Sequence, residues 1–243
     1  MSYNISKYQN ARLLNKLSEK QLSYVAGYID AKGCITCVWL KKINVLMWKL
    51  RISFNNEKDL NNFHNLIGIG NKSNGKRFVI TIGIKESLDL IKNILPFSCI
   101  KSNQLKLMLN YIADILNDEI INKEEYIRDI KLLNEDRSGN YANFNEDTFK
   151  GYFSGLFDGN GSIYLNRRSL ILGIYNTVLK PLELISKIAN GGKIIKITKP
   201  HPKHSQLYFL KFDKAEELEW IYNNLFSNSC KTKKFFKLYK KSL

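Results

Sequence analysis

Residues 25–33 read Val-Ala-Gly-Tyr-Ile-Asp-Ala-Lys-Gly, and residues 153–161 read Phe-Ser-Gly-Leu-Phe-Asp-Gly-Asn-Gly. The two segments share a small second residue, Gly at the third position, Asp at the sixth and Gly at the ninth. They lie 128 residues apart in a chain of 243 residues. A motif repeated at this spacing indicates an internal duplication, in which each half of the chain is one copy of the same structural unit.

The segments that follow the two motifs support this duplication, because their predicted elements occur in the same order. Apolar, β-rich runs alternate with segments in which apolar residues recur at helical spacing. In the first half we predict strands at 34–40, 46–54 and 77–84, a weaker strand before the Gly-rich turn, and helices from about 56 and at 85–95. In the second half we predict strands at 162–165, 170–175, 193–197 and 207–212, and helices at 177–189 and 215–226.

Each half therefore reads α-β-β-α-β-β-α, which predicts an α+β fold of two related repeats. The strands of each repeat should form an antiparallel four-stranded sheet with helices on one face and the other face free. We divide the chain into an N-terminal repeat (1–117), a linker with a short helix (118–147) and a C-terminal repeat with a basic terminal helix (148–243). The linker helix is predicted from apolar residues at helical spacing: Tyr126, Ile127, Ile130 and Leu133.

The composition is strongly basic, with 38 Lys and Arg against 22 Asp and Glu and a formal net charge of +16. The excess is shared, because the first 120 residues hold 17 basic and 9 acidic residues and the rest hold 21 and 13. Charge of this size favours a polyanionic partner, most simply nucleic acid, over the alternative of solubility alone.

We expect a soluble protein, because the sequence contains neither an apolar run long enough for a transmembrane span nor a signal peptide at its start. The chain has 31 Lys against 7 Arg, 27 Asn, 28 Ile and only 7 Ala, a bias typical of AT-rich codons. This bias favours an organelle-encoded gene, and we expect a mitochondrial protein, with the chloroplast as the alternative.

Four cysteines could form two disulfides or a zinc site, and neither hypothesis is favoured. Cys34 and Cys37 have C-x-x-C spacing but fall in a predicted strand, where residues three apart point to opposite faces. No second C-x-x-C pair accompanies them, so we interpret these two, Cys99 and Cys230 as buried reduced thiols. His201 and His204 lie in a Pro- and Lys-rich segment that predicts a surface loop.

Both motifs resemble the nine-residue signature of the LAGLIDADG homing endonucleases, and the resemblance extends over nearly the whole chain except the ends and the linker. It implies a monomer in which two signature helices pack side by side at a pseudo-twofold axis, leaving the sheets as a nucleic-acid-binding saddle. The small residues that match the contact positions of these helices are Ala26, Gly27, Ser154 and Gly155. Small side chains allow two helix backbones to approach closely.

The sequence differs from the family pattern at the eighth position of each motif, where the family has the acid that holds the catalytic metal ions. Those positions are Lys32 and Asn160. Hard divalent cations prefer carboxylate oxygens, an ammonium group repels them, and a single amide oxygen is a weak ligand. We therefore expect no catalytic residue, no metal and no other cofactor. Asp30 and Asp158 occupy the sixth position, which the family treats as structural.

The candidate nucleic-acid contacts are basic residues on alternate strand positions, at the start of the last helix of each half and in the C-terminal segment. Lys101 and Lys231 also match the basic residue that the family places near the scissile phosphates. The candidates are Lys41, Lys49, Arg51, Arg77, Lys101, Arg167, Arg168, Lys193, Lys211, Lys231, Lys233, Lys234, Lys237, Lys240 and Lys241. Interspersed with them are four aromatic residues, Trp39, Trp48, Tyr164 and Tyr208. Those on the open faces can stack on bases, and we expect others to belong to the core, because a register shift of one residue exchanges the two faces.

Two functions follow from the sequence. The favoured one is a catalytically inactive, domesticated LAGLIDADG protein that binds structured RNA in an organelle, either intron RNA as a maturase-like factor or ribosomal RNA as a component of the ribosome. The alternative is a DNA homing endonuclease that uses atypical ligands or was inactivated by design. RNA is preferred over DNA as the partner because RNA binding requires no catalytic carboxylates, and no membrane partner is expected.

Overall fold

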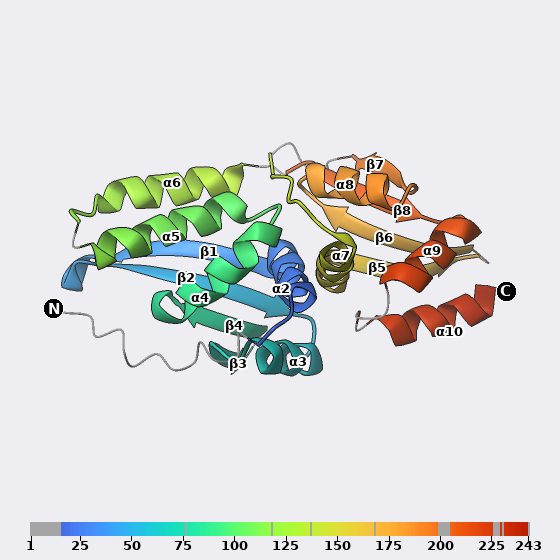
Figure 1. The fold of residues 1–243 in the computed structure, drawn as a ribbon, viewed down its shortest axis with the longest axis horizontal. Coiled ribbons are helices and arrows are strands. Elements are labelled where there is room, and N and C mark those ends of the chain that lie inside the picture. Colours follow the sequence, from blue (N-terminus) through green and yellow to red (C-terminus); the bar gives the residue numbers. More distant parts are fainter. Residues whose placement is uncertain are drawn as a thin grey trace.

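The computed structural model describes residues 16–75, 77–117, 119–136, 138–167, 169–198, 205–225, 229 and 231–242. Two α+β halves lie side by side, and one helix from each half lies in the middle of the molecule (Figure 1). Within the described residues, no helix is both long and apolar enough to cross a membrane.

The first half begins with one of the two central helices and ends with a longer helix on the outside. Its elements are α2 (Glu19–Lys32), β1 (Gly33–Leu40), the short 3-10 helix η2 (Lys41–Ile43), β2 (Val45–Phe54), α3 (Glu57–Ile67), β3 (Asn71–Asn74), β4 (Phe78–Gly83), α4 (Ile84–Ile94), η3 (Leu95–Phe97) and α5 (Ser102–Leu116).

Helix α6 (Lys123–Glu135) follows in the linker, and the second half then repeats the order of the first. Its elements are α7 (Glu146–Asn160), β5 (Gly161–Asn166), β6 (Ser169–Asn176), α8 (Lys180–Ile188), β7 (Lys193–Ile197), β8 (Leu207–Phe212), α9 (Ala215–Leu225) and α10 (Thr232–Ser242).

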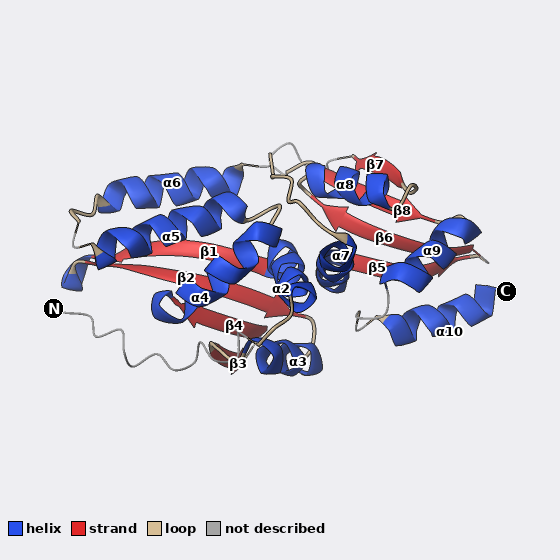
Figure 2. Cartoon of the chain, in the orientation of Figure 1, coloured by secondary structure: helices blue, strands red, loops and turns tan. Residues whose placement is uncertain are grey.

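Both sheets have four antiparallel strands and the same topology, β1-β2-β4-β3 in the first half and β5-β6-β8-β7 in the second. The helices cover one face of each sheet and leave the other face open (Figure 2). The predicted α+β fold of two related repeats is therefore confirmed. The largest boundary difference is in α8: the helix predicted from residue 177 begins at Lys180, because the Asn176 side chain accepts the N–H of Val178 and Pro181 occupies the first turn.

Strand β2 decides which face of the first sheet is buried. Its even-numbered residues, such as Leu50 and Ile52, are fully buried, whereas its odd-numbered residues include Lys49 and Arg51. Because side chains alternate along a strand, this single register assigns every neighbouring strand residue to the helix-covered or the open face.

The same register determines the exposure of Cys34 and Cys37, and the expectation that Cys34 is buried is wrong. Cys34 pairs with Arg51 and is exposed on the open face, whereas Cys37 pairs with the buried Trp48. Cys99 is fully buried. All three are free thiols, and burial raises the pKa of Cys37 and of Cys99 to about 12, so both stay protonated near neutral pH. Cys230, His201 and His204 lie outside the described residues.

Helices α2 and α7 form the centre of the fold, and both start with a side-chain cap. Ser18 and Gln21 form a reciprocal capping box before α2, and Asn145 and Thr148 form the same arrangement before α7. Most residues of both helices are buried, because each helix packs against the other as well as against its own sheet.

The two helix backbones touch directly at a pair of glycines. A Cβ atom at Gly27 would overlap the carbonyl oxygen of Tyr152 and lie 2.9 Å from the amide nitrogen of Leu156. A Cβ atom at Gly155 would overlap the carbonyl oxygen of Tyr24 and lie 2.8 Å from the amide nitrogen of Tyr28. These overlaps are with backbone atoms, which cannot move aside without separating the helices.

We therefore expect Gly27→Ala and Gly155→Ala each to lower the free energy of unfolding by about 1–3 kcal/mol or more, the range for overpacking a close contact. For a chain of this size each kcal/mol corresponds to roughly 2–4 °C in Tm, measured by thermal unfolding. The matched control is Gly75→Ala, because a Cβ atom there meets nothing within 4 Å. An unchanged Tm in both helix variants would mean that α2 and α7 do not touch in solution as described.

Candidate nucleic-acid interface

The open face of the first sheet carries a polar, basic hollow. Lys49 and Arg51 project from β2 on this face, opposite Gly83 and Thr81 of β4. They line a concavity of about 510 Å³, together with Ser73, Gly75, Arg77, Val79 and Thr81. Arg77 lies in the turn between β3 and β4 and is exposed. This hollow brings three cations to one surface, where they can contact the phosphates of a nucleic acid.

The open face of the second sheet is different, because it is mostly apolar and aromatic. Tyr164, Ile171, Tyr175 and Phe209 occupy it, as the register of β5, β6 and β8 requires. Its basic residues are Lys193 and Lys211, which pair directly across β7 and β8, and Lys211 makes an ion pair with Asp213.

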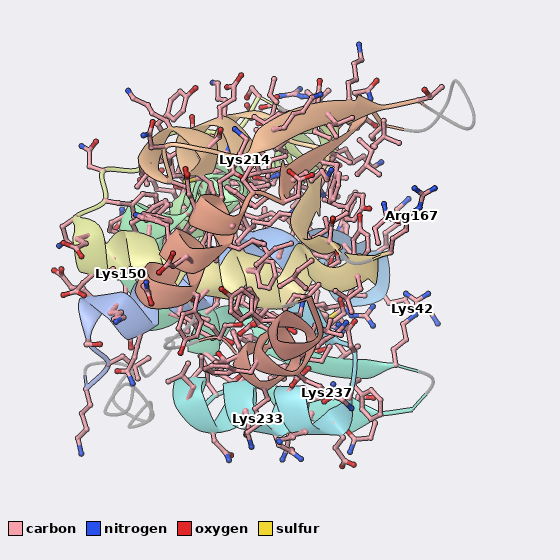
Figure 3. The ribbon with its side chains drawn as sticks, turned by 90° about the vertical axis from the view of Figure 1, so that its right-hand side faces the viewer. Lys42, Lys150, Arg167, Lys214, Lys233 and Lys237 are labelled. Carbon is pink, nitrogen blue, oxygen red and sulfur yellow. The ribbon has the colours of Figure 1, made fainter. Side chains whose placement is uncertain are left out.

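The turns at the outer ends of the two sheets add further cations. Lys41 lies in η2, not in a strand as predicted, and its Nζ lies 5.6 Å from the centre of the Trp39 ring. Arg167 was also predicted on a strand, but it lies in the turn between β5 and β6, because β5 ends at Asn166 and the backbone of Arg167 turns with φ 54°. In Figure 3, Lys42 and Arg167 project towards one side of the molecule, and Lys150 lies on the opposite side. Arg168 lies outside the described residues.

Three of the four aromatic residues predicted on the open faces are instead on the helix-covered faces. Trp48 is only 1% exposed and packs near Tyr111 and Tyr126. Trp39 and Tyr208 also pack against the core, because they share the face of the buried strand residues. Only Tyr164 lies where it was expected. For the other three residues the strand was predicted correctly, but the face depends on a register that the sequence does not decide.

The C-terminal ends of α2 and α7 bring Lys32 and Asn160 close together, the two residues at the eighth positions of the motifs. A Cβ atom at Gly159 would overlap Cβ of Ala31 and lie 3.3 Å from Cγ of Lys32. Asn160 is the last residue of α7, as Lys32 is of α2. The two side chains therefore extend from adjacent helix ends.

A third residue, Lys231, lies at the same end of α7. Its ammonium group donates to the carbonyl oxygen of Phe157 at 2.8 Å and to the carbonyl oxygen of Gly161. Carbonyls at a helix C-terminus lack partners within the helix and attract cations. Lys231 was predicted to contact nucleic acid, and the structure shows its ammonium group bound to the protein backbone.

These helix ends do not fit a divalent cation. They supply ammonium groups from Lys32 and Lys231 and one amide from Asn160, without a carboxylate. Within the part of the chain that the structure describes, no group of three or more His, Cys, Asp or Glu side chains could hold a metal ion.

The two motif aspartates serve the fold. Asp30 of α2 is 4% exposed, and its side chain reaches the backbone segment that precedes α5. Its carboxylate accepts five hydrogen bonds of 2.7–3.0 Å, from Ser98 Oγ, the backbone N–H groups of Cys99, Ile100 and Lys101, and the Tyr152 hydroxyl. Burial raises the pKa of Asp30, and the hydrogen bonds from Ser98 and the backbone oppose this rise.

Asp158 repeats this arrangement in the second half. It accepts from Ser229 Oγ at 2.6 Å and from the Tyr24 hydroxyl at 3.0 Å. Each central helix thus carries a tyrosine that donates to the aspartate of the other helix: Tyr24 to Asp158, and Tyr152 to Asp30. The pair of crossed hydrogen bonds ties the two halves together around the pseudo-twofold axis.

No protein-family model and no curated protein matches the chain, but solved structures do. An I-LtrWI LAGLIDADG homing endonuclease bound to target DNA is 16% identical, with 92% of this chain and 90% of that chain covered and a TM-score of 0.68. The chain has the LAGLIDADG fold. I-GzeII in complex with its DNA target (14% identical, 91% and 89% covered, TM-score 0.65) and I-SmaMI bound to uncleaved DNA (16%, 93% and 91%, 0.67) share it.

The remaining predicted contacts lie at the start of α5 and on α10. Lys101 precedes α5, and its backbone N–H is bound by Asp30. Lys233, Lys234 and Lys237 are exposed on α10, and Lys233 and Lys237 lie at a different edge from Lys42 and Arg167 (Figure 3). Lys240 and Lys241 belong to α10, but their side chains lie outside the described part of the chain.

Sequence reasoning missed the two tyrosines that cross between the central helices. A usable pattern was present, because Tyr24 and Tyr152 each lie immediately before a motif and six residues before its Asp. A hydroxyl repeated at the same place in both copies points to a symmetric contact, which within the LAGLIDADG fold joins the signature helices.

We expect Tyr24→Phe and Tyr152→Phe each to lower the free energy of unfolding by about 1.5–3 kcal/mol, the usual value for a hydrogen bond to a charged group. Chemical denaturation measures this change. Tyr141→Phe is the matched control, because Tyr141 is 60% exposed and its hydroxyl makes only a 3.5 Å contact with Glu183. Losses no larger than that of the control would contradict a role for the crossed tyrosines in holding the halves together.

Proposed function

We propose that this protein is a catalytically inactive member of the LAGLIDADG fold that binds structured RNA. The observation that carries the proposal is the pair Lys32 and Asn160 at the adjacent ends of α2 and α7. In this fold these are the positions at which two acids would hold the metal ions for cutting DNA. The residues present repel or only weakly bind such ions.

The charge of the helix ends supports the absence of cleavage. Hydrolysis of a phosphodiester by this route needs metal ions that activate water and stabilise the leaving oxygen. Lys32 places a positive charge where a dication would have to sit, and Lys231 places a second one at the carbonyls of α7. Both charges favour a bound phosphate group and oppose a metal ion. The helix ends are therefore suited to binding the phosphate backbone of a nucleic acid, not to hydrolysing it.

The distribution of basic residues supports RNA as the partner. Besides the concavity of the first sheet, the exposed lysines of α10 form a second basic surface, which a saddle for one straight duplex does not require. Folded RNA presents several helices and loops to such separated surfaces. The candidate ligands are intron RNA and ribosomal RNA of a mitochondrion or chloroplast. The protein would act on the first as a maturase-like factor and would bind the second as a component of the ribosome.

DNA binding is the second candidate, because the solved structures with the same fold include endonucleases bound to their DNA targets. The open faces of the two sheets are the candidate surface for such a DNA. The two candidates differ in the preferred nucleic acid and in whether the substrate is cut, and both differences can be measured.

We expect no cleavage of duplex DNA containing the locus around the gene of this protein, in the presence of Mg²⁺ or Mn²⁺, because the helix ends carry no carboxylate. Gel electrophoresis of the incubated DNA measures this. The double variant Lys32→Asp with Asn160→Asp is the informative comparison, since it supplies the two missing carboxylates. Specific double-strand breaks made by the unaltered protein would refute the proposal.

We expect the protein to prefer folded RNA over duplex DNA of equal length in competition at fixed salt. Affinity for either should fall steeply with salt, with a slope of about −0.7 to −0.9 in log K against log salt for each neutralised phosphate. Fluorescence anisotropy with labelled RNA and unlabelled competitor measures both quantities. If duplex DNA competes better than RNA, the DNA-binding candidate replaces ours.

Neutralising Lys233, Lys234, Lys237, Lys240 and Lys241 to Gln should weaken RNA binding and reduce the salt slope, because α10 supplies phosphate contacts beyond the sheets. Neutralising an equal number of exposed lysines on helix-covered faces controls for loss of net charge; suitable positions include Lys58, Lys92 and Lys187. Equal losses in both variants would mean that net charge matters and that α10 has no special role.

A further inference from the structure

The open face of the second sheet carries aromatic side chains on its two central strands. Tyr175 of β6 and Phe209 of β8 are direct partners across the sheet, and their rings stack with centres 4.4 Å apart and planes 19° from parallel. Tyr164 lies on the neighbouring edge strand β5 and faces the same way. A four-stranded antiparallel sheet with aromatic residues on its open face is the arrangement by which RNA-recognition sheets stack unpaired bases.

The surface is shaped by a glycine in the centre of the face. A Cβ atom at Gly173 would overlap the Phe209 ring, so only glycine allows this ring to lie flat on the sheet. Phe209 is consequently 6% exposed, whereas Tyr164 and Tyr175 are each 37% exposed. Phe209 and Ile171 form the floor of the face, and the two tyrosines present accessible ring surface above it.

The two tyrosines are close enough to influence each other and a nearby cation. Burial raises the pKa of Tyr175, and the neighbouring Tyr164 raises it further. The ion pair with Asp213 raises the pKa of Lys211, and Tyr164 contributes to that rise as well. The strand register gives the same neighbourhood. Lys211 lies opposite Gly173, Tyr175 lies two residues after Gly173 on β6, and Tyr164 lies opposite Ile171, two residues before it.

The charges around this face favour a nucleic acid over a protein partner. None of the described open-face positions of β5, β6, β7 and β8 is acidic. Lys193 and Lys211 lie on the face and Arg167 at its outer end. Apolar and aromatic area bordered by cations suits a ligand that combines flat bases with phosphates. The first sheet lacks exposed aromatic rings on its open face and presents Lys49, Arg51 and Arg77.

We propose that the two sheets bind different parts of one RNA: the second sheet stacks unpaired bases on Tyr164 and Tyr175, and the first sheet holds the phosphates of an adjoining stem. The ligand is then a junction between double-stranded and unpaired RNA, such as a hairpin loop. This inference rests on the proposed RNA-binding function and specifies which feature of the RNA the protein recognises.

The test compares a hairpin RNA that carries 2-aminopurine in its loop with a blunt RNA duplex made of the same stem. Tyr164→Ala and Tyr175→Ala should each weaken hairpin binding by about 5- to 150-fold, the range for one lost base-stacking contact. Binding of the blunt duplex should not change. Tyr164→Phe and Tyr175→Phe keep the ring and should keep the affinity, and the 2-aminopurine fluorescence should be quenched on binding only when the ring is present.

The control is Tyr141→Ala, which removes an exposed tyrosine from the linker and should leave both affinities unchanged. Thermal unfolding of each variant separates a loss of stacking from a loss of fold, and the Phe variants do so independently. If both Ala variants bind the hairpin as tightly as the unaltered protein, the inference is overturned while RNA binding stands. If duplex DNA outcompetes both RNAs, the proposed function itself fails.

Discussion

The direct backbone contact between α2 and α7 is the constraint on which the rest of the structure depends. Gly27 and Gly155 permit it, because any side chain at either position would overlap the carbonyl oxygen of the facing helix. Once the two helices touch, the Tyr24 and Tyr152 hydroxyls reach the aspartates of the opposite halves. The contact also fixes the distance between the helix ends and holds the two sheets side by side as one extended surface.

The same contact explains why the motif acids of this chain are structural. Asp30 and Asp158 point away from the shared helix ends and towards the segments before α5 and α10, where Asp30 holds three successive backbone N–H groups. The ends themselves carry Lys32, Asn160 and the backbone-bound Lys231. The proposed function rests on this positive charge at the centre of a fold that solved homing endonucleases share.

Features of the fold that depend on local sequence patterns could be predicted, and features that depend on strand register or tertiary packing could not. The repeated motif, with Gly27 and Gly155, indicated two paired helices, and the period of two in β2 placed Lys49 and Arg51 on the open face. The sequence did not decide the faces of Trp39, Trp48 and Tyr208, and Cys34 was wrongly expected to be buried. A shift of one residue in strand register moves every side chain to the opposite face, and nothing local determines that register. The bond of Lys231 to the carbonyls of α7 depends on tertiary packing between segments 70 residues apart, and no spacing in the sequence encodes it.

Sequencing the nucleic acid that is cross-linked to the protein in the cells that naturally contain it tests the central claim most directly. The account predicts that ultraviolet cross-linking and stringent purification recover RNA, that ribonuclease removes the recovered material and deoxyribonuclease does not, and that the reads concentrate in one folded transcript. Recovery of DNA from a single genomic site, resistant to ribonuclease, would contradict the account and favour a protein that uses its LAGLIDADG fold on DNA.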